Sequence, residues 1–262
     1  MAKHKKHKSE RYETVKTLFV AISLAIIIRS LFFEPFHIPS GSMKETLQIG
    51  DFIFVSKASY GYSRYSFPLG IPFFRGRLFE GDGPQRGDII VFRLPSSPRI
   101  DYIKRLIGLP GDRVQVKEGV LYINDKEVPR VREKDYMEES PDRTQVRHIA
   151  RYRETMPEGL SYSVLDDTEF GEVDNTPVYT VPKEHYFFMG DNRDHSIDSR
   201  YSDRVGFVPA ENLVGRAQLI VMSVYEGESL LSVWKWPSIF RSGRFFKKLN
   251  VQDAAPAPAA EK

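Results

Sequence analysis

The sequence predicts a mainly β protein: one N-terminal transmembrane helix, then an all-β domain of antiparallel sheets with a smaller inserted β subdomain. Three observations support this prediction. An apolar run lies near the N-terminus, short β-branched and aromatic runs recur from residue 51 onward, and no long helical periodicity follows the apolar run. The predicted division is a basic segment at 1–16, an anchor at 17–35, a β domain at 36–232 with a polar insertion at about 125–177, and a basic aromatic tail at 233–262.

Composition and charge restrict the class of protein. With 262 residues, 41% hydrophobic and 13% aromatic, the chain can fold one large or two small domains, and global disorder is excluded. Residues 1–16 and 233–262 each carry six cationic and two acidic side chains, so the middle is acidic although the net charge is +3. Basic ends suit anionic lipid better than a nucleic-acid groove. The absence of cysteine excludes thiol catalysis, thiolate metal sites and disulfides.

The predicted anchor begins with an uncharged run at residues 17–28, which Arg29 interrupts before Leu31 to Phe33. Residues 17–28 alone are fewer than the ~18 apolar residues of a spanning helix. When Leu31 to Phe33 are included, the segment reaches that length, provided that the Arg29 side chain extends to the lipid headgroups. A cleavable signal peptide is the alternative, but no small-x-small site follows directly. We therefore expect an uncleaved anchor in the cytoplasmic membrane. Lysines before it keep the N-terminus cytoplasmic and place the β domain outside.

The strand predictions rest on short apolar runs bounded by turn residues, at 52–55, 88–92, 101–103, 114–116, 120–123, 178–181, 186–189 and 217–222. Lys117-Glu118-Gly119 predicts a hairpin. Residues 130–172 are polar, with modest strand signals at 146–150 and 160–164, and are expected to lie outside the core. The tail around Trp234 and Trp236 is interpreted equally well as lipid-contacting or as packed on the domain, and an Ala/Pro-rich disordered end follows Asp253.

Candidate chemistry begins at Ser40-Gly41-Ser42, which is either a linker turn or the place of a nucleophilic hydroxyl. The six histidines form no metal-ligand pair, and no Gly-x-Ser-x-Gly elbow or marked histidine base is present. A lysine can serve as base if burial lowers its pKa. Lys104 lies in an apolar strand where alternation predicts one cation inward, either Lys104 or Arg105, and the other solvated. Both cations extending to solvent is the alternative.

A second polar segment covers residues 190–200, behind an aromatic strand. It combines charged side chains with two serine hydroxyls. This composition is typical either of a plain turn network or of residues that orient a catalytic group. The Asp-Asn-x-Asp spacing at its start faintly resembles a calcium loop but lacks the terminal Glu and the spacing of an EF-hand.

Taken together, these segments resemble bacterial type I signal peptidases, a family of Ser/Lys-dyad serine proteases. The similarity runs in order from about Phe33 to Ala217, apart from the polar middle. Any one segment is modest evidence, whereas five in the same order are specific. The matching segments are residues 36–43, 49–55, 86–92, 102–112, and 190–194 with Ser196, Asp198, Ser199 and Arg200.

The resemblance implies an all-β fold in which Ser42 is the nucleophile and Lys104, uncharged, is the general base. Ser40 would join the backbone N–H of Ser42 in the oxyanion hole. Ser196 would hydrogen-bond the Lys104 amine, and Asp198 would pair with Arg200 with Asp191 nearby. The substrate-binding positions that carry over are Phe36, Ile38, Met43, Leu47, Ile53, Val91, Tyr102 and Ile103.

The expected function is that of a membrane-anchored serine endopeptidase, which removes N-terminal signal peptides from exported preproteins after small-x-small motifs. The expected partners are preprotein signal peptides and membrane lipid, with no nucleic acid, no metal and no cofactor. The oligomeric state is not predicted. The alternatives are a self-cleaving repressor, which the anchor argues against, a conjugation-type processing peptidase, and a catalytically dead membrane-anchored β domain that only binds partners.

Two departures from the family pattern are visible. The family usually reads Met-x-Pro-Thr-Leu after the nucleophile, whereas this chain has Lys44-Glu45 between Met43 and Thr46. We expect the missing proline to loosen this turn modestly and Glu45 to add a charge near the site. The segment after Arg200-Tyr201, Ser202 to Gly206, is also longer than the usual form of the family.

Overall fold

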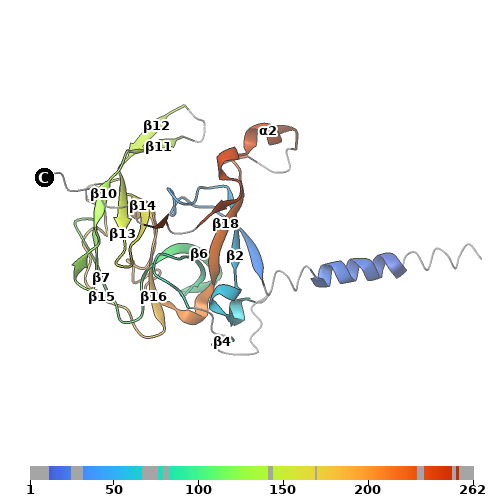
Figure 1. The fold of residues 1–262 in the computed structure, drawn as a ribbon, viewed down its shortest axis with the longest axis horizontal. Helices are drawn as coiled ribbons and strands as arrows, with labels where there is room; N and C mark the ends of the chain where they lie inside the picture. The colour runs from blue at the N-terminus through green and yellow to red at the C-terminus, as the bar shows by residue number, and fades with distance from the viewer. Residues whose placement is uncertain are drawn as a thin grey trace, which may run out of the picture.

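A computed structural model describes residues 12–24, 32–66, 76–78, 83–140, 144–168, 170–228, 233–249 and 252–253. Figure 1 shows a body of β-strands, with a helix extending away from it on the N-terminal side. Within the described residues beyond that helix, the one α-helix is the four-residue α2 (Trp236–Ile239), and 3₁₀ turns supply the remaining helical residues. The prediction of a mainly β chain is confirmed.

The N-terminal helix covers residues 12–24, and its side chains are almost all exposed. No helix within the described ranges has both the length and the apolar character needed to span a bilayer. Residues 25–31 of the predicted anchor, residues 1–11 of the basic segment and the Ala/Pro-rich end from residue 254 lie outside the described residues. The predicted end of the anchor at residue 35 is wrong, because strand β1 (Phe33–His37) already begins at Phe33.

One large antiparallel sheet organises the domain. Its order is β1-β2-β18-β5-β6-β16-β17, and β19 pairs with β18 off this path. The strands after β1 are β2 (Asp51–Ser56), β5 (Ile89–Leu94), β6 (Ser97–Gly108), β16 (His185–Met189), β17 (Val208–Pro209), β18 (Leu213–Ser223) and β19 (Lys247–Lys248). The Ser42 segment lies between β1 and β2. In the strand order, β2 is two strands from β5 and three from β6, which carries Lys104.

Four smaller sheets complete the fold. One has the order β15-β7-β8-β9 and another β10-β13-β14-β20, while β11-β12 and β3-β4 are two-stranded. Their bounds are β3 (Tyr62–Ser63), β4 (Arg77–Leu78), β7 (Arg113–Lys117), β8 (Val120–Ile123), β9 (Lys126–Glu127), β10 (Arg130–Arg132), β11 (Tyr136–Glu139), β12 (Val146–Ile149), β13 (Arg151–Thr155), β14 (Leu160–Leu165), β15 (Tyr179–Thr180) and β20 (Gln252–Asp253). The predicted hairpin is confirmed: Lys117 pairs with Val120, and Glu118 and Gly119 both have positive φ, as a tight two-residue loop requires.

Three apolar clusters form the core. The first lies under β5 and β6 near Phe92 and Phe188, and the second gathers around Met43, Leu47 and Ile53. The third joins β6 to β7, β8 and β14, and it includes Tyr162 and Val164. The expectation that residues 130–172 lie outside the core is therefore wrong, since β14 buries its apolar side chains against the central sheet.

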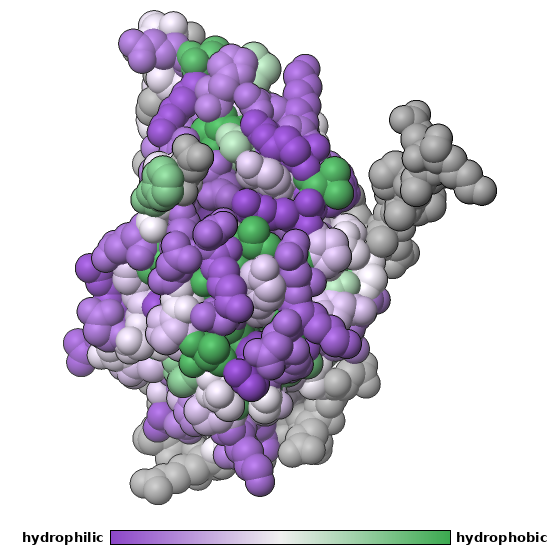
Figure 2. Space-filling view, turned by 90° about the vertical axis from the view of Figure 1, so that its left-hand side faces the viewer, coloured by the Kyte–Doolittle hydropathy of each residue, from purple (hydrophilic) through white to green (hydrophobic). Residues whose placement is uncertain are grey.

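The outer surface differs between regions. Figure 2 shows the face on the side of the small sheets, which is mostly hydrophilic with hydrophobic residues in small patches. The C-terminal segment also carries large exposed aromatic side chains, with Trp234 and Phe246 76% and 68% exposed. This segment carries β19 back onto β18 and buries Leu249 in the cluster around Met43.

Candidate active site

Ser42 lies in a tight turn, residues 41–47, which we call the Ser42 turn. The amide of Lys44 donates to the carbonyl of Gly41 at 3.0 Å, and that of Leu47 donates to the carbonyl of Met43 at 2.8 Å. Met43 and Leu47 are fully buried beneath the turn, and Ser42 itself is buried. The two apolar anchors therefore fix the turn from below.

Lys104 reaches Ser42 from the middle of β6. Its Nζ lies 2.5 Å from the Ser42 Oγ and 3.1 Å from the carbonyl oxygen of Ile103. The side chain is 4% exposed. Burial lowers the Lys104 pKa to about 8, with Asp198 and Asp191 opposing this shift and Arg200 adding to it. Among the described residues, no histidine forms a recorded hydrogen bond with either side chain.

Arg105 corrects the expectation that one of the two neighbouring cations is solvated. Arg105 is 2% exposed, and it forms a two-point ion pair with Asp191, through Nε at 2.8 Å and Nη2 at 2.6 Å. Its guanidinium also donates to the Gly87 carbonyl and the Thr46 hydroxyl. Both faces of β6 are covered in this fold, so alternation along the strand does not place either cation in water.

The polar segment 190–200 packs directly behind Ser42. The backbone amide of Asn192 donates to the Ser42 carbonyl at 3.1 Å, and its side-chain amide donates to the Gly41 carbonyl at 3.0 Å. The expected pair of Asp198 and Arg200 is present, with Nε to Oδ1 at 2.9 Å and both side chains buried. These contacts hold the main chain of the Ser42 turn from a loop about 150 residues away.

Ser196 does not form the expected hydrogen bond with Lys104. Its Oγ is buried and has no hydrogen-bond partner among the described residues. A side chain at Gly190 would place its Cβ 2.2 Å from that Oγ and 2.5 Å from the Ser42 carbonyl. The three residues are therefore in close contact, and Gly190 is required for this approach.

The remaining predicted positions surround Ser42. Ser40 is exposed, and its Oγ lies 3.5 Å from the Ser42 Oγ. Of the eight predicted substrate-binding positions, Phe36, Tyr102 and Ile103 are partly exposed, and the others are buried. The buried five are Ile38, Met43, Leu47, Ile53 and Val91, all in the cluster under the Ser42 turn. The structure therefore buries five of these positions beneath the Ser42 turn and leaves three partly accessible to solvent.

Sequence reasoning missed the arginines of the C-terminal segment. Arg244 pairs with the buried Asp51 through Nε at 3.0 Å and Nη2 at 2.5 Å, and donates to the Thr46 carbonyl at 2.9 Å. Arg241 donates to the Ile49 carbonyl at 2.9 Å. The only available signal was the basic character of the tail, which does not indicate where the side chains go.

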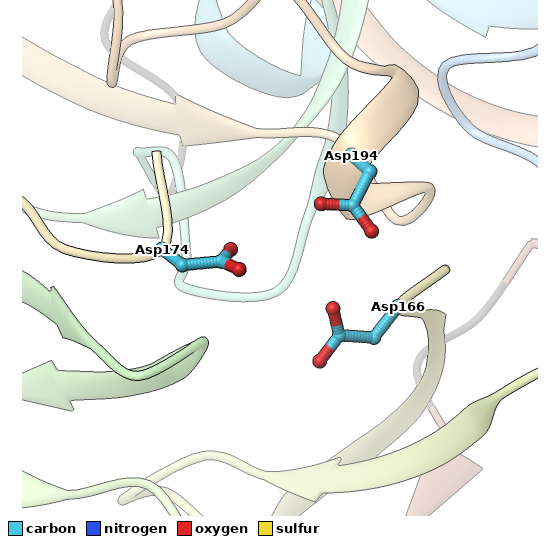
Figure 3. A group of neighbouring side chains, drawn as sticks. All are labelled: Asp166, Asp174 and Asp194. Carbon is cyan, nitrogen blue, oxygen red and sulfur yellow. The ribbon is translucent and has the colours of Figure 1, made fainter. Parts of the chain in front are cut away.

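One acidic cluster lies outside this site. One carboxylate oxygen from each of Asp166, Asp174 and Asp194 lies within 4.8 Å of the others. Figure 3 shows the three side chains grouped together. Arg130 pairs with Asp166 at 2.8 Å, and backbone amides donate to Asp194 and to Asp174. Burial, together with the nearby Asp194 charge, raises the pKa of Asp166. The cluster thus has cationic and amide partners within the protein itself.

Comparisons with known proteins place these features in a family. A family model described as signal peptidase, peptidase S26, matches residues 11–222. Signal peptidase I of Rickettsia typhi is 42% identical over 267 residues, covering 95% of this chain and 98% of the relative. That of Rickettsia akari is 44% identical over 228 residues, covering 83% and 81%.

A crystal structure of a signal peptidase I from Enterococcus faecalis is 31% identical, with a TM-score of 0.30, and covers 52% of this chain and 97% of that chain. The family model and the relative from Rickettsia typhi each span most of this chain, including the segments that contain Ser42 and Lys104. The chain belongs to the signal peptidase family, peptidase S26.

Proposed function

We propose that the protein cleaves N-terminal signal peptides from exported preproteins after small-x-small motifs, with Ser42 as nucleophile and Lys104 as general base. As a member of its family the chain is a signal peptidase enzyme. The proposal for the dyad rests on one observation, the 2.5 Å contact between the Lys104 Nζ and the Ser42 Oγ within a buried site.

The geometry fits the chemistry of acyl transfer. The uncharged Lys104 amine takes the Ser42 hydroxyl proton as Oγ attacks the scissile carbonyl carbon. The resulting oxyanion is held by the Ser42 backbone N–H and the Ser40 hydroxyl. When the C–N bond breaks, the Lys104 ammonium returns its proton to the departing amine. Lys104 then activates a water molecule that hydrolyses the Ser42 ester.

The surroundings of Lys104 support its role as a base. Burial favours the uncharged amine, while Asp198 is engaged by Arg200 and Asp191 by Arg105. Each neighbouring carboxylate is thus neutralised by its own arginine, which limits its stabilisation of the lysine ammonium. A pKa of about 8 keeps a useful fraction of Lys104 unprotonated near neutral pH.

We also propose that the segment from residue 17 to the start of β1 anchors the protein in the cytoplasmic membrane, with the catalytic domain outside. Trp234, Trp236 and Phe246 are exposed beside Lys247 and Lys248, a composition that suits the lipid headgroup region. A preprotein carries its own apolar segment. Confining enzyme and substrate to one membrane replaces tight binding by a high effective concentration.

The test is cleavage of a purified preprotein by the full chain in detergent micelles. We expect Ser42→Ala and Lys104→Met to lose cleavage by at least about a thousandfold. In the wild-type enzyme, activity should rise with pH and level off above about 8, because Lys104 must lose its proton. Full cleavage by Ser42→Ala would contradict the proposal, because a group other than the Ser42 hydroxyl would then have to be the nucleophile.

A further inference from the structure

The hairpin formed by β11 and β12 is structurally separate from the other sheets. Its register runs from Tyr136 opposite Ile149 to Glu139 opposite Val146. Within the described strands, neither β11 nor β12 pairs with a third strand. The hairpin projects from the body at the same end of the molecule as α2 (Figure 1). Side-chain contacts, rather than a backbone ladder, therefore decide where it docks.

Two ion pairs of opposite polarity connect the hairpin region to the Ser42 turn. Lys44 Nζ lies 2.5 Å from Glu138 Oε1 of β11. Arg151, the first residue of β13 just after the hairpin, lies 3.3 Å from Glu45 Oε1 through Nη1 and also pairs with Glu133 at 3.4 Å. These side chains are 19% to 27% exposed, so solvent screens them less than fully exposed pairs. The turn presents the cation Lys44 followed by the anion Glu45, and their partners Glu138 and Arg151 carry the opposite charges. These charges match in only one orientation of the partner chain relative to the turn. Lys44 and Glu45 are the residues that replace the usual x-Pro of the family.

A cavity of about 470 Å³ lies between the docked hairpin, the Ser42 turn and the C-terminal segment. The turn and the chain after it contribute Lys44, Gln48 and Ile49, the hairpin contributes residues 136–140, and Tyr225 and Arg241 close the opposite side. Hydroxyl, amide and carboxylate groups dominate this lining. The hairpin supplies one complete wall, so the cavity exists in this form only while the hairpin is docked.

We propose that this cavity receives the first residues of the mature protein, beyond the scissile bond, and that the two ion pairs hold the hairpin in place as its wall. The inference rests on the proposed function. Phe36, Tyr102 and Ile103 are the partly exposed apolar side chains among the predicted substrate-binding positions, and they suit small apolar residues before the cleavage site. The lining of the polar cavity begins at Lys44, two residues after Ser42 in the chain. An extended polar chain that leaves the nucleophile enters it within a few residues, where the lining can bind its backbone groups.

The kinetic test compares two peptides with the same signal-peptide side, which end two or ten residues beyond the cleavage site. The enzyme is the full chain in detergent micelles. We expect the wild type to prefer the longer peptide in kcat/KM, and Glu138→Lys to reduce this preference about fivefold, mainly through KM. The charge-swapped double variant Lys44→Glu/Glu138→Lys should restore it. Asp125→Lys, with the same charge change in a remote exposed pair, is the matched control.

A binding measurement provides a readout independent of turnover. The chain has no cysteine, so Val146→Cys, at an exposed position of β12, accepts a single fluorescent label. In a Ser42→Ala background, the long peptide should change the label's emission saturably, and the short peptide should not. The proposal is overturned if both peptides act alike on the label, or if Glu138→Lys affects their cleavage equally. Persistent cleavage by Ser42→Ala would instead refute the proposed function.

Discussion

At the scale of single residues, the central feature is the burial of Lys104. The side chain is buried and lies beside Asp191 and Asp198, yet burial dominates and its pKa falls to about 8. In the unfolded chain the same amine has the ordinary lysine value. Between pH 8 and 10.5 the unfolded chain therefore binds more protons, so stability rises with pH in that window. Below pH 8 the folded protein bears the full cost of a buried ammonium.

The first prediction follows from this cost. Lys104→Met should abolish cleavage and yet raise the free energy of unfolding at pH 7 by up to about 3 kcal/mol, the equivalent of the pKa shift. The gain should shrink as the pH approaches 10.5. Urea unfolding of both proteins at pH 7 and pH 10 measures it. A variant less stable than the wild type at both values would contradict the assigned burial cost.

Glu45 supplies a second residue-scale prediction. Its φ is +81°, a left-handed conformation that proline cannot adopt. The turn is hydrogen-bonded and anchored, so it is not the loosened turn that the sequence led us to expect. Restoring the family's proline by Glu45→Pro should therefore destabilise the protein by more than about 1 kcal/mol and reduce kcat.

Glu45→Gly is the matched control for this prediction, because glycine accepts the backbone conformation while losing the same carboxylate. We expect it to keep most of the activity. Thermal unfolding and peptide cleavage of both variants provide the measurement. If the proline variant matched the glycine variant, the assigned turn conformation would be wrong.

The structure brings Ser42 and Lys104 into contact, and their catalytic roles stay a prediction, whereas the expectation for Arg105 was wrong. The order of the family segments pointed to Ser42 and Lys104. General chemistry added that burial lowers the pKa of a lysine. For Arg105, strand alternation assumed that one face of β6 meets water. The arginine's partner, Asp191, lies 86 residues away, so no local pattern predicted the pair.

At the scale of elements, the Ser42 turn is held by segments from distant parts of the chain. The loop at Asn192 binds its backbone, the hairpin region pairs with Lys44 and Glu45, and the C-terminal segment donates to Thr46. This last contact lies beyond the residues that the family model matches, which end at 222. The turn's geometry thus depends on residues that the motifs do not include.

The corresponding prediction concerns Arg244. Arg244→Gln removes the two-point pair with buried Asp51 and the bond to the Thr46 carbonyl, so we expect kcat/KM to fall about tenfold or more. Arg244→Lys, which keeps the charge, should lose less. Lys247→Gln removes an exposed charge nearby and serves as control. Equal activity of Arg244→Gln and Lys247→Gln would show that the pair does not support the turn.

Elements with a local signal were predictable, and those defined by tertiary contacts were not. The hairpin at Glu118 and Gly119 was read from its turn residues. By contrast, β1 was assigned to the anchor because Phe33 continues an apolar run, and only its pairing with β2 makes it a strand. Likewise β6 extends from Ser97, well before the apolar residues that revealed it.

At the scale of the whole molecule, a buried polar network joins the insertion to the centre of the fold. Arg193, in the loop behind Ser42, forms a two-point ion pair with Glu154 of β13 at 2.6 and 2.5 Å. Tyr162 of β14 donates to the same carboxylate, and Arg105 lies over its ring. The polar composition of residues 130–172 led us to expect a separate unit, because a charge that becomes buried cannot be distinguished in sequence from a solvated one.

The prediction at this scale is that Glu154→Gln destabilises the entire domain. It leaves the Arg193 guanidinium buried without its counter-charge, and breaking such a pair costs about 3–5 kcal/mol. Asp125→Asn, in an exposed pair with Arg113, should change stability by less than about 0.5 kcal/mol. Urea unfolding of the two variants provides the comparison. A similar small effect for both would mean that the insertion folds independently of the core.

The contacts between Asn192 and the Ser42 turn also have a consequence for the time at which the Ser42 site is completed during synthesis of the chain. Ser42 emerges from the ribosome about 150 residues before the loop that holds its backbone. Until that loop has emerged and folded, the Ser42 carbonyl lacks its fixed partner, and the Asp191 and Asp198 pairs around Lys104 are absent as well. A nascent chain therefore lacks these contacts around Ser42 and Lys104 until nearly the whole of the described β domain has been synthesised.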